Sequence, residues 1–228
     1  MSLFVAGMIL AIGTLFGQST EKETINVSGF TEIGFGVAGN LYVKIGPEFN
    51  VVLEGDKKYL SEIETTVRNG KLIIRNTNYR FFNNEKIKVY ISLPELKGLG
   101  VSGSGDAQIE SPIKNESLEL NVSGSGNILV PDLVTDNLNS SISGSGDIIL
   151  KGSGEIGKGD ISISGSGSFS GETTSYKNLQ VHISGSGNCT CNVTESLNAS
   201  ISGSGNVHYI GNPKVNARVS GSGHVRSK

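Results

Sequence analysis

The tetrapeptide Ser-Gly-Ser-Gly recurs seven times between residues 102 and 223 of this 228-residue chain. Successive copies are 21, 20, 21, 20, 18 and 18 residues apart. A period near twenty is too short for a four-stranded propeller blade and carries no helical pattern, but it matches one coil of a β-solenoid. The spacing therefore predicts an all-β fold, a parallel β-helix or β-solenoid with coils of about 20 residues, in which each tetrapeptide forms a corner.

Alternating apolar residues flank the corners on both sides. Leu118, Leu120 and Val122 precede the second copy, and Ile128 and Val130 follow it. A period of two places these side chains on one face of a strand, which we expect to point inward. Each coil is thus predicted to contain a strand, a corner, a second strand and a return segment of variable length, with the coils stacked as parallel strands.

The composition of the corner has a physical reason. Glycine adopts positive φ without a Cβ clash, and serine hydroxyls stacked about 4.8 Å apart would donate and accept hydrogen bonds in a ladder. The residue after the corner is mostly Asp or Asn, which bond nearby backbone amides. The predicted corner ladder comprises Ser102, Gly103, Gly105, Asp106, Ser123, Asn127, Ser143, Asp147, Ser164, Ser184, Asn188, Ser202, Asn206 and Ser220.

The chain divides into three segments. Residues 1–17 read as a signal peptide or an uncleaved anchor, because the apolar run from Leu3 to Phe16 is short for a bilayer and ends at a small residue, although no Lys or Arg precedes it. Residues 26–98 lack the corner but alternate like strands, and we expect them to continue the solenoid. Within them, 56–66 is predicted as a short helix that covers the first coil. Residues 99–228 hold the seven repeats.

The overall charge limits the classes of partner. A formal net charge of −2 gives no field that would steer the chain toward nucleic acid or an anionic membrane. Hydrophobic residues make up 36% of the chain and recur in alternating segments, which argues against disorder. We therefore expect no nucleic-acid partner and no membrane span in the mature protein.

Cys189 and Cys191 stand in the sequence Asn-Cys-Thr-Cys-Asn. A two-thiolate metal corner and a strained disulfide are the alternatives to a structural role. The two cysteines align with Ile128 and Val130 of an earlier coil, so we expect both to be core thiols that face the apolar interior. No further Cys or His ligand sits near them in the sequence, and we expect neither a metal nor a cofactor.

An enzyme is the main alternative function, because polysaccharide-cleaving enzymes also use β-helices. Such an enzyme needs clustered carboxylates and a basic residue. The repeats are poor in charge, and the only candidates are Lys151, Glu155, Lys158 and Asp160 in one return segment. We expect no catalytic residues and keep a carbohydrate-active enzyme, or a self-assembling scaffold, as alternatives.

Three short segments and the repeats together resemble a known family. With Phe30-Thr-Glu-Ile33, the segment from Val89 to Leu96, and Tyr209-Ile-Gly-Asn-Pro213 in view, the chain resembles the autotransporter adhesin, head GIN domain family of Bacteroidetes over residues 26–225. The resemblance implies an exported, oligomeric β-helical protein with an adhesin-like surface role. The expected function is a non-enzymatic cell-envelope or surface protein that binds an unidentified glycan or protein, in the periplasm, on the outer membrane or outside the cell.

Overall fold

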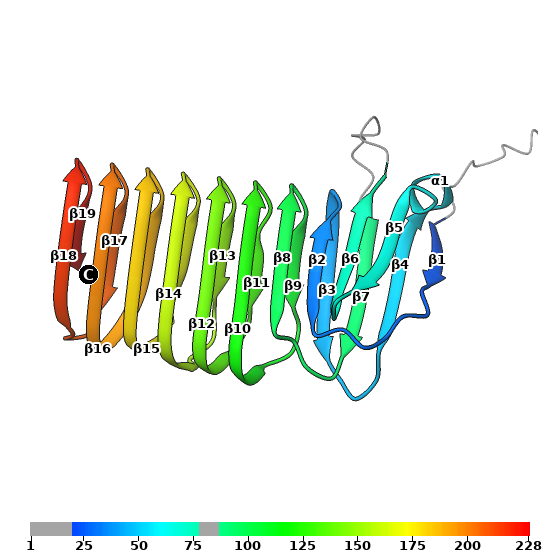
Figure 1. Cartoon of the computed structure of the whole chain (residues 1–228), viewed down its shortest axis with the longest axis horizontal. Coiled ribbons are helices and arrows are strands. Elements are labelled where there is room, and N and C mark those ends of the chain that lie inside the picture. Colours follow the sequence, from blue (N-terminus) through cyan, green and yellow to red (C-terminus); the bar gives the residue numbers. More distant parts are fainter. Residues whose placement is uncertain (1–19, 78–86) are drawn as a thin grey trace, which may run out of the picture.

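The computed structural model of the chain describes residues 20–77 and 87–228 and is a β-solenoid of about 6 turns with coils about 20 residues apart (Figure 1). Strands account for 73% of the structure and helix for 2%, which confirms the predicted fold class. The predicted signal peptide, residues 1–17, lies outside the described residues.

Each coil consists of two main strands that meet at the corner. We call the strand that runs into the corner the leading strand and the strand that runs out of it the trailing strand. Leading strands stack side by side into a leading face and trailing strands into a trailing face (Figure 1).

In spatial order, the leading face consists of β5 (Ile63–Arg68), β6 (Lys71–Asn76), β2 (Glu32–Gly36), β8 (Gly98–Gly103), β10 (Ile113–Gly124), β12 (Leu133–Gly144), β14 (Glu155–Gly165), the later parts of β15 (Ser168–Gly185) and β16 (Asn188–Gly203), and β18 (Lys214–Gly221). The trailing face consists of β1 (Thr20–Thr24), β4 (Asn50–Asp56), β7 (Ile87–Leu93), β3 (Gly39–Ile45), β9 (Asp106–Ile109), β11 (Ile128–Val130), β13 (Asp147–Leu150), the first parts of β15 and β16, β17 (Asn206–Ile210) and β19 (His224–Ser227).

The core is a set of columns along the solenoid axis. Because the parallel strands are in register, an inward residue of one coil lies on its equivalent in the next coil. One such column is at most 3% exposed and contains Val122, Ile142, Ile163, Ile183 and Ile201. Adjacent coils therefore share one continuous apolar interior.

The first coil is placed out of sequence order. Strands β2 and β3 lie between the coil of β6 and β7 and the coil of β8 and β9, in parallel with both. Their corner reads Gly36-Val37-Ala38-Gly39, at the place where the next coil has its first Ser-Gly-Ser-Gly. Residues 26–98 thus contribute strands to the solenoid in a coil order that differs from their order in the sequence. No local pattern in the sequence indicates this change.

The N-terminal end is closed by antiparallel strands. β5 pairs with β6, β4 pairs with β7, and β1 pairs with the outer edge of β4. The predicted helix over 56–66 is wrong in extent: α1 is a single turn, Lys57–Leu60, capped by the Asp56 carboxylate. Asn69 and Gly70 both have positive φ, and this hairpin turn draws 63–68 into β5 rather than into a helix.

The C-terminal end has no such cover among the described residues. Every residue of β18 is exposed, and its inward-facing Val215 and Val219 are 38% and 44% exposed because no further coil lies on them. The solenoid therefore has one capped and one open end. In the part of the chain that the structure describes, no helix has the length and apolar character needed to cross a membrane.

Candidate functional site

The outward side chains of the leading face stand in rows along the solenoid. Each outward position pairs with its equivalent in the next coil, so like residues follow one another. We call the two rows nearest the corner the serine face. Its corner row contains Ser123, Ser143, Ser164, Ser184 and Ser202, and its inner row contains Asn121, Ser141, Ser162, His182 and Ser200.

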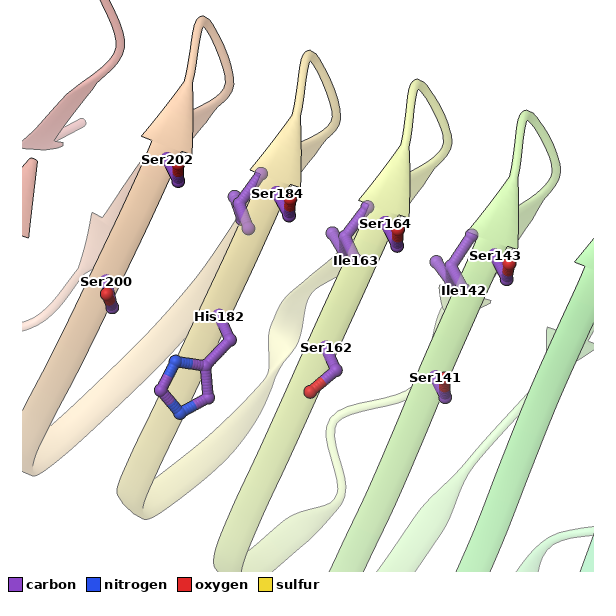
Figure 2. A pocket seen from close by; sticks show the side chains of 11 residues that line it. Ser141, Ile142, Ser143, Ser162, Ile163, Ser164, His182, Ser184, Ser200 and Ser202 are labelled. Carbon is purple, nitrogen blue, oxygen red and sulfur yellow. The ribbon is translucent and has the colours of Figure 1, made fainter. Parts of the chain in front are cut away.

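An open groove of about 330 Å³ runs along the serine face. In Figure 2, Ser141 and Ser143 lie on one strand, and the rows continue on the neighbouring strands with the His182 ring among the serines. Each hydroxyl both donates and accepts hydrogen bonds, and the strands repeat about every 4.8 Å. The face thus offers an extended partner a regular array of polar groups.

The expected ladder of serine hydroxyls is not formed. Among the residues that the structure describes, no hydrogen bond joins the hydroxyls of successive corner serines such as Ser143 and Ser164. The physical reason is that the short serine side chains stand in the same orientation on successive strands, which keeps their hydroxyls about 4.8 Å apart, beyond the reach of a direct O–H···O bond (Figure 2). The corner serines are exposed, so their hydroxyls face solvent.

The residues after the corners form the ladder instead. Asp106 Oδ1 accepts hydrogen bonds from the backbone N–H and the side-chain amide of Asn127, at 3.2 and 2.7 Å. Asn127 Oδ1 accepts from the backbone N–H of Asp147 at 3.0 Å, and Asp147 Oδ1 accepts from Ser168 at 2.8 Å. The amide of Asn206 donates to Asn188 at 3.0 Å. These bonds link four pairs of successive coils and fix the start of the trailing strands there.

The corner backbone adds a second link between coils. The N–H groups of Ser145 and Gly146 donate to the carbonyl of Gly124 in the preceding coil, at 2.8 and 3.1 Å. Gly144 has a φ of 130°, and a Cβ there would lie 2.3 Å from the same carbonyl oxygen. Glycine is needed at this position because the corners approach one another through their backbones.

The structure places Cys189 and Cys191 in the interior as free, fully buried thiols. A hydrogen bond with Cys191, together with burial, raises the pKa of the Cys189 thiol well above its usual value. The nearby Tyr176 is also fully buried, and its hydroxyl has no hydrogen-bond partner among the described residues. Burial raises the pKa of Tyr176 as well, with smaller contributions from the two cysteines.

The charged residues considered for catalysis do not converge. Lys151 lines a groove on the trailing face, whereas Glu155 lines a different groove and forms an ion pair with Lys177 at 2.9 Å. Lys158 and Asp160 are outward residues of the leading strand β14. Within residues 20–77 and 87–228, no three His, Cys, Asp or Glu side chains are grouped as metal ligands.

Sequence reasoning missed an aromatic pair on the trailing face. Tyr42 and Tyr90 stack with ring centroids 5.2 Å apart and an interplanar angle of 16°. Alternation places both rings outward, since Leu41 and Val43 point inward on β3 and Val89 and Ile91 point inward on β7. Their proximity has no local signal, because it depends on the out-of-order placement of β2 and β3.

Comparison with known families gives a match over most of the chain. A family model described as "Putative auto-transporter adhesin, head GIN domain" matches residues 29–213. None of the curated proteins compared with the chain is a significant match.

Several solved structures share the fold. A putative adhesin from Bacteroides fragilis has a TM-score of 0.85 and 24% identity, and the match covers 93% of this chain and 98% of that one. A protein from Parabacteroides distasonis, described as a putative lipid binding protein, has a TM-score of 0.74 and 26% identity, covering 92% and 96%. A putative adhesin from the same organism has a TM-score of 0.75 and 23% identity, covering 92% and 97%. These matches support the solenoid over its whole length.

Proposed function

This chain belongs to the auto-transporter adhesin, head GIN domain family, and from that premise we propose that it is a non-enzymatic, adhesin-like scaffold that binds another macromolecule at the cell envelope or surface. Residues 26–98 and 99–228 act in this proposal as one domain, and residues 1–17 direct export. The observation that carries it is the serine face, whose rows of polar groups repeat along the solenoid without converging on a reaction centre.

The geometry suits adhesion to an extended partner. A single hydroxyl contributes little net binding free energy, because it exchanges a hydrogen bond with water for one with the ligand. Rows of hydroxyls on a rigid sheet sum many such contacts, and the sheet holds them in place before binding, which reduces the entropy lost on association. No single residue then carries the interaction, in keeping with an adhesin rather than an enzyme.

A binding panel tests this proposal. The purified chain is applied to a glycan array, to immobilised mucin, fibronectin and collagen, and to phospholipid vesicles, because one structural neighbour is described as a putative lipid binding protein. We expect a saturable interaction with at least one glycan or protein. Folded chain that binds nothing on the panel, or that releases products from polysaccharides, would contradict the proposal.

Variants locate the interaction on the serine face. Ser141→Arg combined with Ser200→Arg places two long charged side chains on exposed positions of the inner row, and we expect binding to weaken about tenfold or more. Ser117→Arg is the matched control, because Ser117 is exposed on β10 but lies away from the groove. Equal effects of the double variant and the control would mean that binding does not use the serine face. Light scattering during gel filtration separates this role from self-assembly.

A further inference from the structure

A second groove, of about 420 Å³, lies on the trailing face across β3, β9, β11 and β13. We call it the tyrosine groove, because the Tyr42 ring stands at one end of it. Its volume falls within the range of about 300–1,000 Å³ that is usual for small-ligand sites. It is separate from the serine face, since the leading and trailing strands point their outward residues in different directions.

Tyr42 is flanked on both sides within its outward row and lines the groove. Tyr90 stacks on one side, and Lys22 Nζ lies 5.9 Å from the centre of the Tyr90 ring. The Asn40 amide donates a hydrogen bond to the Tyr42 hydroxyl at 3.3 Å. On the other side, strand register places Gln108 next to Tyr42, and both residues line the groove. The ring is therefore a fixed aromatic wall.

The floor of the groove is apolar at positions where the strands otherwise point polar groups outward. Register continues the row of Tyr42 through Gln108 to Leu129 and Ile149. Both aliphatic residues point outward, because they alternate with the inward residues of β11 and β13, and both are half-buried. An aromatic wall and an aliphatic floor favour a ligand with C–H surfaces.

Polar groups of fixed orientation border this floor. Asp106, Asn127 and Asp147 line the groove, and the ladder bonds of their Oδ1 atoms hold the three side chains in place. The Oδ2 atoms of the two carboxylates accept no hydrogen bond from the described residues. They remain as acceptors for hydroxyl donors on a ligand. Among the described residues that line it, Lys151 is the only cation and Asp106 and Asp147 are the only anions, so their net charge is −1.

We propose that the tyrosine groove binds a neutral hexose chain, with one sugar ring against Tyr42 and sugar hydroxyls donating to Asp106 and Asp147. This inference rests on the proposed binding role and names a ligand class for a second site. A pyranose ring combines an apolar C–H face with hydroxyl donors at its rim, which is the combination that the groove offers. The negative charge disfavours anionic chains, because a ligand carboxylate would be placed near two protein carboxylates.

Titration calorimetry with defined oligosaccharides tests the inference. Cellohexaose, laminarihexaose and a mannose hexamer serve as neutral probes, and an oligogalacturonate serves as the anionic one. The chain has six tyrosines and no tryptophan, so a ligand-induced change in tyrosine emission that is lost in Tyr42→Ala gives a second readout at Tyr42. We expect at least one neutral probe to bind and the galacturonate to bind more weakly or not at all.

Variants of Tyr42 decide whether binding occurs at the groove. Tyr42→Ala is expected to weaken binding about tenfold, which corresponds to about 1.4 kcal/mol. Tyr42→Phe keeps the ring and is expected to retain the wild-type affinity. Thr190→Ala is the matched control, because Thr190 lies farther along the same outward row, beyond the groove. Circular dichroism confirms that each variant is folded.

Three results with the oligosaccharides would overturn the inference. These are no binding of any neutral probe, preferential binding of the galacturonate, and equal affinity of wild type and Tyr42→Ala. A partner from the panel that is lost with the double serine-face variant, while Tyr42→Ala and wild type bind the neutral probes equally, would leave the adhesin-like role standing and remove the glycan site. A protein partner that needs Tyr42 would assign the groove to a polypeptide instead, and would equally overturn the hexose proposal.

Discussion

The first glycine of a stacked corner combines a positive φ with close approach to the preceding coil, and Gly144→Ala tests what each of these costs. At Gly144 the φ of 130° lies in a region that almost only glycine adopts, which costs an alanine about 1–3 kcal/mol. The new Cβ would also lie 2.3 Å from the Gly124 carbonyl oxygen, and such overpacking typically costs about 1–3 kcal/mol more. The expected loss of unfolding free energy is about 4 kcal/mol.

The chain supplies a matched control at its first corner. Gly103 has a φ of 88°, but a Cβ there would meet nothing within 4 Å, because the neighbouring corner of β2 and β3 has a different backbone shape. Gly103→Ala should therefore cost only the backbone strain, about 1–2 kcal/mol. At about 3 °C per kcal/mol, the melting temperature falls by about 12 °C for Gly144→Ala and about 4 °C for Gly103→Ala.

Thermal unfolding followed by circular dichroism measures both shifts. Hydrogen exchange shows which coils lose stability, because the stability of a solenoid is a sum over its coils and the interfaces between them. For Gly144→Ala we expect the faster exchange in β12 and in its neighbours β10 and β14. Equal destabilisation by the two variants would refute the reasoning, because it would mean that close approach between corners adds nothing to backbone strain.

Two further predictions concern the core. Tyr176→Phe should leave stability at neutral pH unchanged or raise it, because the buried hydroxyl has no partner among the described residues. Unfolding measured between about pH 8 and pH 12 then tests how the tyrosine proton affects stability. Burial raises the pKa of Tyr176, so above about pH 10 only the unfolded chain loses this proton, and the unfolding free energy of the wild type falls with rising pH. If the unfolding free energy of the wild type fell no more steeply with pH than that of the variant, this reasoning would be contradicted. Along one inward column, Ile183→Ala should cost about 2–5 kcal/mol in urea unfolding, whereas Val219→Ala, 44% exposed at the open end, should cost about 0.5 kcal/mol or less. Similar losses at both positions would show that the last coil is covered in solution.

The repeating part of the fold could be predicted from the sequence alone. Each coil repeats the same local signals, which are a twenty-residue period, alternating apolar residues and a glycine corner. The register of the parallel strands then follows when equivalent positions of successive repeats are paired. This reasoning placed columns such as the one that contains Ile142 and Ile183 in the interior. It also indicated that residues after the corners, such as Asp106, bond to backbone amides, because that chemistry depends on residue type and turn position.

Features that depend on how the coils are ordered and how side chains meet across them became visible only in the folded chain. The serine hydroxyls do not bond to one another because the short side chains point the same way on successive strands, an orientation that the sequence does not reveal. The end cover is mostly antiparallel strand because the Asn69-Gly70 turn pairs β5 with β6. Tyr42 and Tyr90 are 48 positions apart and stack only because β3 lies between β7 and β9. Contacts of this kind arise from how non-repeating segments fit against one another, and no period in the chain encodes them.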